Sequence, residues 1–431
     1  MPVKVYDDTH SLHNIGSVIM SYNPYQNAFV NALVNRIGMV LVTSKLWDDP
    51  WAVFNKGKLE YGETLEEIFV NLAKPHSYNP SEAESKFMKR EIPDVRAAFH
   101  TLNYQKFYKV TVQEQDLQLA FLSWSGITDL ITKITDSMYT GMNYDLYIVR
   151  KYMLCREILN GGMGEYPVYS GNSGLVEKAR SYSSKFAFLK KAFNRAGVYN
   201  AVDRDAQYII IDTDTEAAID VNVLAAAFHM DRAEFLGHLK IVDSWTDHDT
   251  DRLAELFAND STYSAFDSTD ITNLGLVGGV LMDRDWWFVL DKENKMTQDY
   301  NGEGLYWQYW LHRWCVISAS PFANIVAFVT SAGTISSVTL TPSSASMYVG
   351  TSMQFTASVS GSGIYDSSVT YSVAASGSGA TTLASGTRID PSSGLLYIDP
   401  EETNAQVTVT AKANGKPTVT DTTDVTITDN Q

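Results

Sequence analysis

Length, composition and charge describe a globular protein of more than one domain. The 431 residues are 45% hydrophobic and 12% aromatic with 19% charged, which excludes disordered, coiled-coil and collagen-like classes. At roughly 150 residues per domain, about two or three domains are expected. A formal charge of −17 repels phosphate backbones and anionic lipid, so tight binding of nucleic acid over the whole surface is excluded.

The cysteines and the amino-terminal segment indicate a reducing compartment. Cys155 and Cys315 lie far apart in apolar runs, so they form no disulfide framework and no zinc ligand set. Residues 1–10 lack the basic patch and apolar stretch of a signal peptide, which disfavours secretion. No stretch approaches the roughly 20 uninterrupted apolar residues that a membrane crossing needs, so we expect a soluble protein.

The first predicted element is a projecting β-hairpin. Residues 51–54 and 58–61 flank Asn55-Lys56-Gly57, and a glycine in a turn supplies a positive φ. The charged residues at its tip are Lys56, Lys58, Glu60 and Glu63. Charges of both signs suit a salt-dependent contact with a neighbouring molecule. The alternative is a solvated hairpin without a partner.

A long helix is the clearest element of the chain. Apolar residues recur at spacings of three and four over 117–138, and Asp116 precedes them as a possible cap. After an expected break at Thr140-Gly141, a second helical run ends at Gly161-Gly162, where a left-handed C-cap is expected. Together the two runs predict one bent spine. Strands are expected before it at 95–99 and 107–112.

Residues 208–215 carry the most tempting catalytic pattern. An apolar strand ends in Asp212 and Asp214, which is similar to the first motif of haloacid-dehalogenase phosphatases, where one aspartate attacks phosphorus and the next acts as general acid. This chemistry also needs a magnesium-binding acidic pair on a later strand and a lysine, and nothing after residue 215 supplies them in a βα context. We therefore favour a strand end with helix-capping aspartates, with a hydrolase as a rival.

Other candidate sites also favour a structural role. Residues 247–251 begin like a calcium loop, but Arg252 and Ala258 replace its glycine and glutamate. The histidines show no ligand spacing, so no metal, cofactor or catalytic residue is predicted. The aromatic run 305–314 could stack bases or sugars, yet such strands more often belong to a core or a subunit interface.

The composition changes near Gly333. The nine tryptophans lie between Trp47 and Trp314, and the residues after Gly333 are rich in Ser and Thr, so two folding units are predicted. Predicted tail strands are 336–340, 352–359, 369–373, 394–398, 406–412 and 418–427. This density of short strands is typical of a β-sandwich.

Several segments together resemble the major capsid protein of phi-29-type short-tailed bacteriophages. They are residues 62–68, 99–100, 107–108, 121–124 and 217–230, the segment that runs from 305–307 to 322–324, and residues 326–329. The tail resembles a bacterial immunoglobulin-like domain of group 2 through Val338-Thr339-Leu340, Gly350 and Phe355-Thr356-Ala357. The similarity runs through nearly the whole chain in one order.

The resemblance implies an α+β chain with a Hong Kong-97-type phage capsid fold, followed by an all-β immunoglobulin-like sandwich. The implied parts are a shell domain at 1–332 with an N-terminal arm, an extended loop at about 45–72, a peripheral domain with a spine helix at about 116–160 and an axial domain at about 185–315, and then the sandwich at 333–431. The extended loop is expected to lie on a neighbouring subunit. Its expected interface residues are Trp51, Phe54, Lys56, Lys58, Glu60 and Glu63.

The implied function is self-assembly into an icosahedral or prolate shell around the double-stranded DNA of a tailed phage. Implied partners are further copies in pentamers and hexamers, a scaffolding protein, the portal or connector, and head fibres, with no membrane. The protein would be assembled in the bacterial cytoplasm and reside in the virion. Besides the hydrolase, the rival is a cell-surface or glycan-binding adhesin that carries an immunoglobulin-like module.

Overall fold

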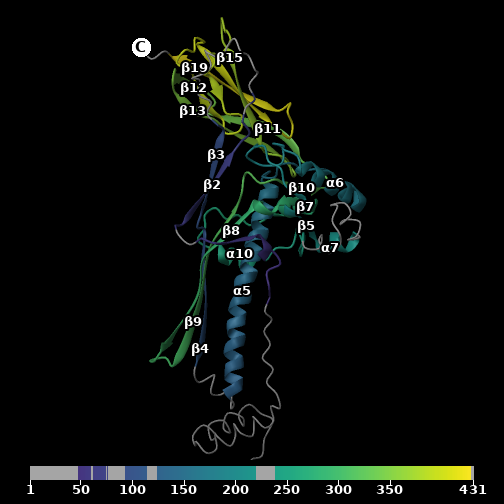
Figure 1. Cartoon of the computed structure of the whole chain (residues 1–431), viewed down its shortest axis with the longest axis vertical. Coiled ribbons are helices and arrows are strands. Elements are labelled where there is room, and N and C mark those ends of the chain that lie inside the picture. Colours follow the sequence, from purple (N-terminus) through teal and green to yellow (C-terminus); the bar gives the residue numbers. More distant parts are fainter. Residues whose placement is uncertain are drawn as a thin grey trace, which may run out of the picture.

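The computed structural model describes residues 47–59, 62–73, 75, 93–113, 124–219 and 238–428 (Figure 1). The α-helices are α5 (Trp124–Leu159), α6 (Gly171–Phe186), α7 (Thr213–Ala218), α10 (Thr250–Leu256) and α11 (Ser268–Leu274). Short 3-10 helices are η1 (Ala52–Phe54), η3 (Arg204–Ala206) and η4 (Arg284–Trp286). In the described part of the chain, no helix is both long enough and apolar enough to cross a bilayer.

The spine is one uninterrupted helix. α5 has 36 residues, which is about 54 Å at a rise of ~1.5 Å per residue, and it follows the long axis of the molecule (Figure 1). The predicted break at Thr140-Gly141 is wrong, because Met138 and Met142 on either side pack into one cluster with strand residues. Packing of this kind outweighs the weak helix propensity of glycine. The predicted end is confirmed, since Gly161 has a φ of 73°.

A long sheet lies beside the spine. Its strand order is β1-β8-β9-β4. These strands are β1 (Asn55–Lys58), β8 (Trp287–Asn301), β9 (Tyr306–Ala319) and β4 (Tyr104–Gln113). The strand predicted at 107–112 is confirmed within β4. Tyr309 and Leu311 of β9 are buried against Met138 and Met142 of α5, so one face of the sheet is covered by the helix.

A second sheet is buried on both faces. Its order is β10-β7-β5-β6, formed by β10 (Ile325–Val329), β7 (Val277–Asp283), β5 (Gln207–Asp212) and β6 (Leu239–Val242). Alternate residues of β5 face opposite sides: Ile210 joins the cluster that contains α5, whereas Ile209 and Ile211 join the cluster that contains α6. This explains the continuous apolar run that predicted a strand ending at Asp212.

A two-stranded antiparallel hairpin, β2 (Thr64–Val70) and β3 (Val95–Thr101), extends from the molecule near the tail (Figure 1). The strand predicted at 95–99 is confirmed within β3. The predicted extended loop at about 45–72 thus includes only one strand of this hairpin, β2. The other strand, β3, lies after residue 72.

The tail has its own hydrophobic core. One sheet has the order β12-β19-β18-β15, a second β13-β17-β16, and β11 pairs with β14. These strands are β11 (Thr334–Thr341), β12 (Ala345–Tyr348), β13 (Ser352–Gln354), β14 (Thr356–Ser362), β15 (Val369–Ser376), β16 (Arg388–Ile389), β17 (Leu395–Tyr397), β18 (Gln406–Ala413) and β19 (Thr420–Thr428). Every predicted tail strand is found, although 352–359 is divided between β13 and β14, and β12 and β16 were not predicted.

Candidate assembly surface

The hairpin predicted around residues 55–57 is wrong. These residues belong to β1, an edge strand that pairs in parallel with β8 at Asn55↔Val289 and Lys58↔Asp291. Gly57 has the expected positive φ, 109°, but it serves a register irregularity within the strand pairing, not a turn between two strands. The positive φ predicted for Gly57 is therefore confirmed, and the turn predicted around it is wrong.

The two aromatic residues of the predicted interface lie in the protomer's own core. Trp51 and Phe54 are fully buried. The ring of Trp51 meets Tyr147 of α5 at 5.1 Å, and the ring of Phe54 meets Tyr208 of β5 at 5.2 Å. The backbone oxygen of Trp51 also accepts a hydrogen bond of 2.8 Å from buried Arg150. These side chains therefore join β1 to the spine and offer no surface to a neighbour.

The charged residues of that prediction differ among themselves. Lys56 Nζ lies 3.1 Å from Asp285 Oδ1 and 3.9 Å from the ring centroid of Phe288, so its charge has partners within the chain. Lys58 and Glu63 are exposed. Glu60 lies outside the described residues. Whether these charges contact a neighbour stays a prediction.

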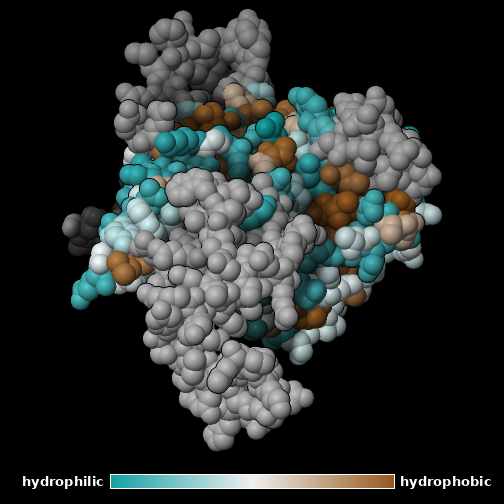
Figure 2. All heavy atoms as spheres, turned by 90° about the horizontal axis from the view of Figure 1, so that it is seen from below, coloured by the Kyte–Doolittle hydropathy of each residue, from teal (hydrophilic) through white to brown (hydrophobic). Residues whose placement is uncertain are grey.

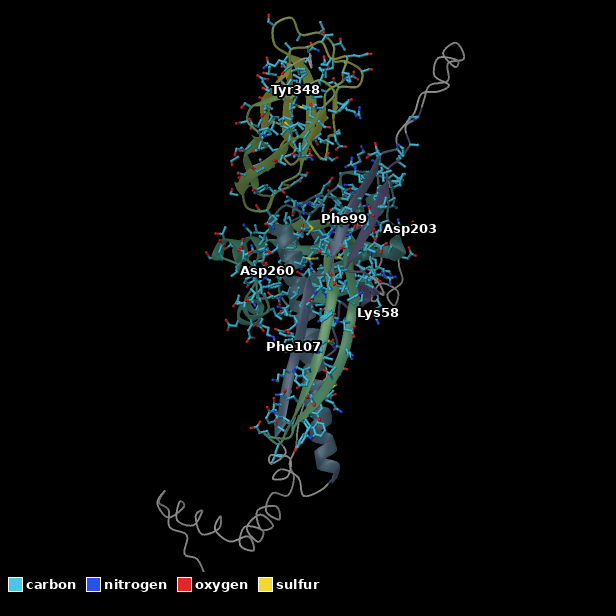
Figure 3. All side chains as sticks on the ribbon, turned by 90° about the vertical axis from the view of Figure 1, so that its left-hand side faces the viewer. Lys58, Phe99, Phe107, Asp203, Asp260 and Tyr348 are labelled. Atoms are coloured by element: carbon cyan, nitrogen blue, oxygen red, sulfur yellow. The ribbon has the colours of Figure 1, made fainter. Side chains whose placement is uncertain are left out.

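The hairpin β2–β3 carries an apolar outer face. Residues that share a face pair as Ile68↔Ala97 and Val70↔Val95, and Phe99 lies next along β3. We call Ile68, Val70, Val95 and Phe99 the outer patch; their exposed fractions run from 50% for Val95 to 65% for Phe99. Figure 3 shows Phe99 on the hairpin, above Phe107 of β4 along the long axis. Another face of the molecule also shows apolar side chains among hydrophilic ones (Figure 2).

The inner face of the same hairpin holds a polar network that packs against β9. His100 is 3% exposed; its Nδ1 lies 2.8 Å from Ser318 Oγ and its Nε2 lies 3.1 Å from Glu67 Oε2. Ser320 Oγ donates to the other oxygen of Glu67 at 2.8 Å, and the His100 ring stacks on Phe288 at 4.3 Å. Each polar group thus has a partner, as burial demands, and the network fixes the hairpin to β9.

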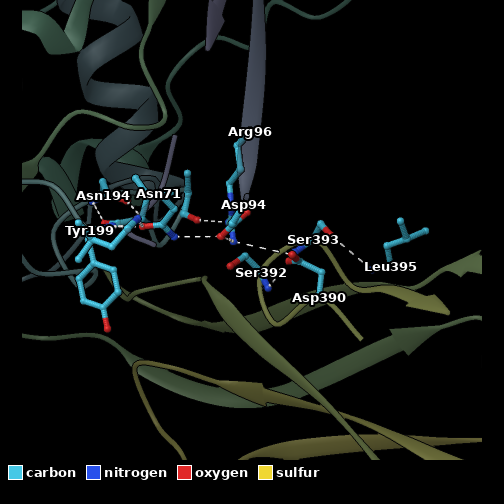
Figure 4. Close-up of polar contacts among 12 residues, drawn as sticks. Asn71, Asp94, Arg96, Asn194, Tyr199, Asp390, Ser392, Ser393 and Leu395 are labelled. Atoms are coloured by element: carbon cyan, nitrogen blue, oxygen red, sulfur yellow. Dashed lines mark hydrogen bonds and ion pairs between the residues drawn. The ribbon is translucent and has the colours of Figure 1, made fainter. Parts of the chain in front are cut away.

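A second polar group joins the loop end of the hairpin, where β2 ends and β3 begins, to the tail domain (Figure 4). Arg96 of β3 donates to the oxygen of Ala196 at 2.6 Å, and its guanidinium also meets Asp94 at 3.3 Å and Asp390 of the tail at 3.8 Å. Asn71 donates to Asp94 at 3.0 Å. The hydrogen bond from Asn71 is the largest of the effects that lower the pKa of Asp94, and Arg96 adds to it. Burial opposes the charged form of Asp390, but the amides of Ser393 and Ser392 together with Arg96 outweigh it and lower the pKa of that carboxyl as well, so both carboxylates at this junction are favoured in their charged form.

The predicted catalytic pair has a structural role at the end of β5. Asp212 is the N-cap of α7 and accepts from the Thr215 amide at 3.0 Å, which confirms the expected helix cap. Asp214 lies in the first turn of that helix, where negative charge is favourable. Asp249, from the calcium-like segment, caps α10 in the same way. Over the described ranges, no group of three His, Cys, Asp or Glu residues is placed to hold a metal ion.

The aromatic run at 305–314 lies in β9. Tyr309 and Leu311 face the spine and are buried, whereas Trp314 points to the opposite face and is 38% exposed. The expectation of a core strand is confirmed for the covered face. The network of His100 and Glu67 and the outer patch were missed at the sequence level, although the apolar, β-favouring run Ile68-Phe69-Val70 carried a signal for a strand.

A rigid helical spine, a sheet that lies along it and an extended hairpin with an apolar outer face describe a structural subunit that associates with other molecules. The Phi29-like phage major capsid protein family matches residues 4–329, and the chain belongs to this family. The major capsid protein of Bacillus phage B103 is 34% identical over 94% of this chain and 84% of its own length. That of Bacillus phage GA-1 is 34% identical over 80% and 70%. The protein is a capsid shell protein.

Solved structures agree on the fold. A chain in the capsid of Staphylococcus phage Andhra has a TM-score of 0.56 at 15% identity and covers 68% of this chain and 87% of its own. A chain in the structure of the head fibre and inner core protein of native bacteriophage P68 has a TM-score of 0.52 at 14% identity, covering 68% and 88%. The mixed α/β fold is that of phage capsid proteins. The comparisons favour a virion shell component built from many copies, and they do not favour the adhesin.

Proposed function

We propose that copies of this chain, with a Hong Kong-97-type fold, form pentamers and hexamers in an icosahedral or prolate shell around the double-stranded DNA of a tailed phage. In this proposal the outer patch of the β2–β3 hairpin lies on the next copy around each ring. A ring needs a heterologous contact, in which one surface meets a different surface of the neighbour. The observation that carries the proposal is the outer patch, whose four apolar side chains are each at least 50% exposed on the hairpin.

Burial of the outer patch supplies a reason for association. Complete burial of one Val, Ile or Phe side chain is worth about 1.5–3 kcal/mol. Part of this is offset by the loss of translational and rotational freedom on binding, so a single contact is modest. A closed shell repeats the contact in every subunit, and the sum holds the shell together. A two-stranded hairpin alone is marginally stable in water, so the neighbour also orders it.

Substitution of Phe99 tests this role. We expect Phe99→Ser in the full chain to raise the protein concentration needed for shell formation about tenfold, which corresponds to ~1.4 kcal/mol per contact. Sedimentation and negative-stain electron microscopy would measure it. Tyr348→Ser is the matched control, because Tyr348 is 54% exposed on the tail and should leave assembly unchanged. Equal assembly of both variants would remove the outer patch from the proposal.

The exposed charges near β1 belong to the edge of the same contact. Lys58 and Glu63 are placed to meet charges of the neighbour, with Glu60 between them in sequence. We expect Lys58→Glu to alter the salt dependence of assembly more than Lys56→Glu, because Lys56 is paired with Asp285 in its own chain. Light scattering at 50 and 300 mM NaCl would compare them. The reverse ranking would contradict this assignment.

The tail is proposed to be an immunoglobulin-like domain of bacterial group 2 that lies outside the shell, with residues 1–332 as the shell domain and residues 333–431 as the sandwich. Its separate core and antiparallel pairings β15–β18 and β18–β19 support this. Limited proteolysis of filled particles checks the location, because an outer domain is cleaved while the shell stays closed. Full protection of the tail in particles that remain intact would place it inside.

The remaining partners follow from the shell role. We expect a scaffolding protein to guide closure, a portal or connector to occupy one vertex, and head fibres to bind the outside, with assembly in the host cytoplasm. The enclosed DNA is held without sequence-specific contacts, and the charge of −17 keeps the protein from binding its backbone tightly. Assembly, not catalysis, is the proposed activity. Co-expression with and without each partner, followed by electron microscopy, tests these expectations.

A further inference from the structure

The tail inserts one side chain into the core of the shell. Ile364 follows β14 and is 0% exposed. It belongs to the hydrophobic cluster that contains Ile158 of α5 and Val329 of β10, whereas the other clustered side chains of the tail form the tail's own core. Beside it, the backbone oxygen of Ile364 accepts a hydrogen bond of 2.6 Å from the amide of Gly333. The two units therefore share a buried contact.

The tail also caps the spine helix. α5 ends at Leu159, and the Ser367 hydroxyl lies 2.8 Å from the oxygen of Asn160 and 3.2 Å from the oxygen of Gly161, to which it donates. The final carbonyls of a helix have no hydrogen-bond donor within the helix. The Ser367 hydroxyl supplies a donor to the carbonyl of Asn160 at the end of the spine. A Cβ at Gly161 would lie 2.5 Å from Ser367 Oγ. Glycine at this position thus permits the approach as well as the positive φ.

The third contact reaches the hairpin. Asp390, which faces Arg96 at 3.8 Å, is held in place by the amides of Ser392 at 2.9 Å and Ser393 at 2.8 Å (Figure 4). Arg96 in turn bonds to Ala196 in the loop after α6. One guanidinium therefore connects the hairpin, that loop and the tail. Its side chain is 18% exposed, which limits screening by solvent.

We infer that the tail domain is a clamp that fixes the direction of the β2–β3 hairpin relative to the end of α5. Ile364 and Ser367 anchor the tail to the spine, and Asp390 holds the loop end of the hairpin through Arg96. The clamp sets the direction of the outer patch before a neighbour binds, so less ordering is left to occur on assembly. The consequence for assembly rests on the proposed role of the hairpin; the clamp itself does not.

Hydrogen–deuterium exchange of the unassembled full chain tests the clamp. We expect Asp390→Asn to speed amide exchange in residues 64–70 and 95–101 about threefold, and Ser367→Ala to do so in the last turn of α5, because each substitution removes one modest polar contact. Glu401→Gln and Ser358→Ala, two exposed positions of the tail, are the matched controls and should change neither region. Changes confined to residues 333–428 would overturn the clamp.

Ile364→Val is a mild test of the buried anchor. We expect faster exchange at both the end of α5 and the hairpin, because loosening the shared contact affects both attachments. Unchanged exchange at both places would contradict the inference.

If Asp390→Asn loosens the hairpin while Phe99→Ser assembles normally, the clamp holds and the proposed hairpin contact fails. If Phe99→Ser blocks assembly while Asp390→Asn and Ser367→Ala change no exchange outside the tail, the clamp fails alone.

Discussion

The hairpin and the tail sheet use the same two-residue alternation in opposite ways. In β18 of the tail, Val407 and Val409 point inward and are fully buried, while Thr408 and Thr410 lie on the other face. In the hairpin, His100 and Glu67 lie on the inner face beside Phe69, which stacks on Phe322, while the apolar outer patch faces outward. The tail therefore buries the apolar face of β18 within the chain, whereas the hairpin leaves the burial of its outer patch to another molecule.

This difference separates folding from assembly. A sheet that buries its apolar face against a partner layer is stabilised within one domain. An exposed apolar face contributes stabilisation only when a partner covers it, and monomeric proteins rarely leave large apolar patches open. Substitutions in β18 should thus act on the stability of the single chain, and substitutions in the outer patch should act on the shell.

The largest expected effect is on the tail core. Val409→Asp buries an unpaired carboxylate and should lower the free energy of unfolding of the tail by at least about 4 kcal/mol, measured by urea unfolding of the full chain. Val70→Asp is the matched change on the hairpin's outer face and should cost less than about 0.5 kcal/mol before assembly. Similar losses for the two variants would abolish the distinction between the sheets.

The next effect concerns the polar inner face of the hairpin. Glu67→Leu leaves His100 and Ser320 without their shared acceptor, which should cost about 2 kcal/mol of local stability and accelerate amide exchange in residues 95–101. Glu66→Leu, on the exposed face of the same strand, is the control and should leave exchange there unchanged. If Glu67→Leu behaves like the control, the inner network does not hold the hairpin.

The tail strands and the spine show how far sequence patterns reach. The strand signal over 406–412 and the three-and-four spacing over 117–138 predicted β18 and α5, and described residues of both elements, Val407 and Val409 in β18 and Met138 in α5, pack against their own chain. The break at Thr140-Gly141 was wrong, since local glycine propensity was weighed without the sheet that packs on Met138 and Met142. Residues 116–123, which include the predicted cap Asp116, lie outside the described residues.

The assembly surface was harder to predict for a physical reason. Asn55-Lys56-Gly57 has turn chemistry, but the parallel partner of β1 lies more than 200 residues later in β8, and no local signal reports such a pairing. Residues 64–70 have no clean alternation of polar and apolar side chains, and Ile68 and Val70 face solvent while Phe69 packs on Phe322, so the pattern does not identify the outer face. The contacts of Ile364 and Ser367 with the shell domain could not be predicted either, because they depend on how the shell domain and the tail pack together.

A smaller effect is expected on the pH dependence of the tail's stability. Burial is the main cause that raises the pKa of the Asp366 carboxyl above its usual 3.8. The protonated carboxyl therefore stabilises the tail fully below pH 3.8, and this stabilisation is lost as the pH rises through the raised pKa of the folded state. Asp366→Asn keeps an acceptor for the Ser368 amide and should raise the Tm of the tail by about 2 °C at pH 7.5. Calorimetry should find this gain shrinking toward pH 4; a gain that grows on acidification would contradict it.

The smallest expected effect concerns Lys56. Lys56→Gln removes a partly exposed ion pair with Asp285 and should lower the stability of the unassembled chain by less than about 1 kcal/mol, detected as a shift in the urea midpoint that 0.5 M NaCl diminishes. Lys58→Gln, on the same strand, should leave that midpoint unchanged. Equal shifts for both variants would show that the contact with Asp285 contributes nothing specific.

Thiol labelling gives the most direct test of the claim that the hairpin's outer face meets a second copy. Native Cys155 and Cys315 are fully buried, so a single introduced cysteine reports alone. We predict that Ile68→Cys reacts with a maleimide in the unassembled chain and is protected in closed shells, while Tyr348→Cys on the tail reacts in both. Equal labelling of Ile68→Cys before and after shell closure would contradict the account.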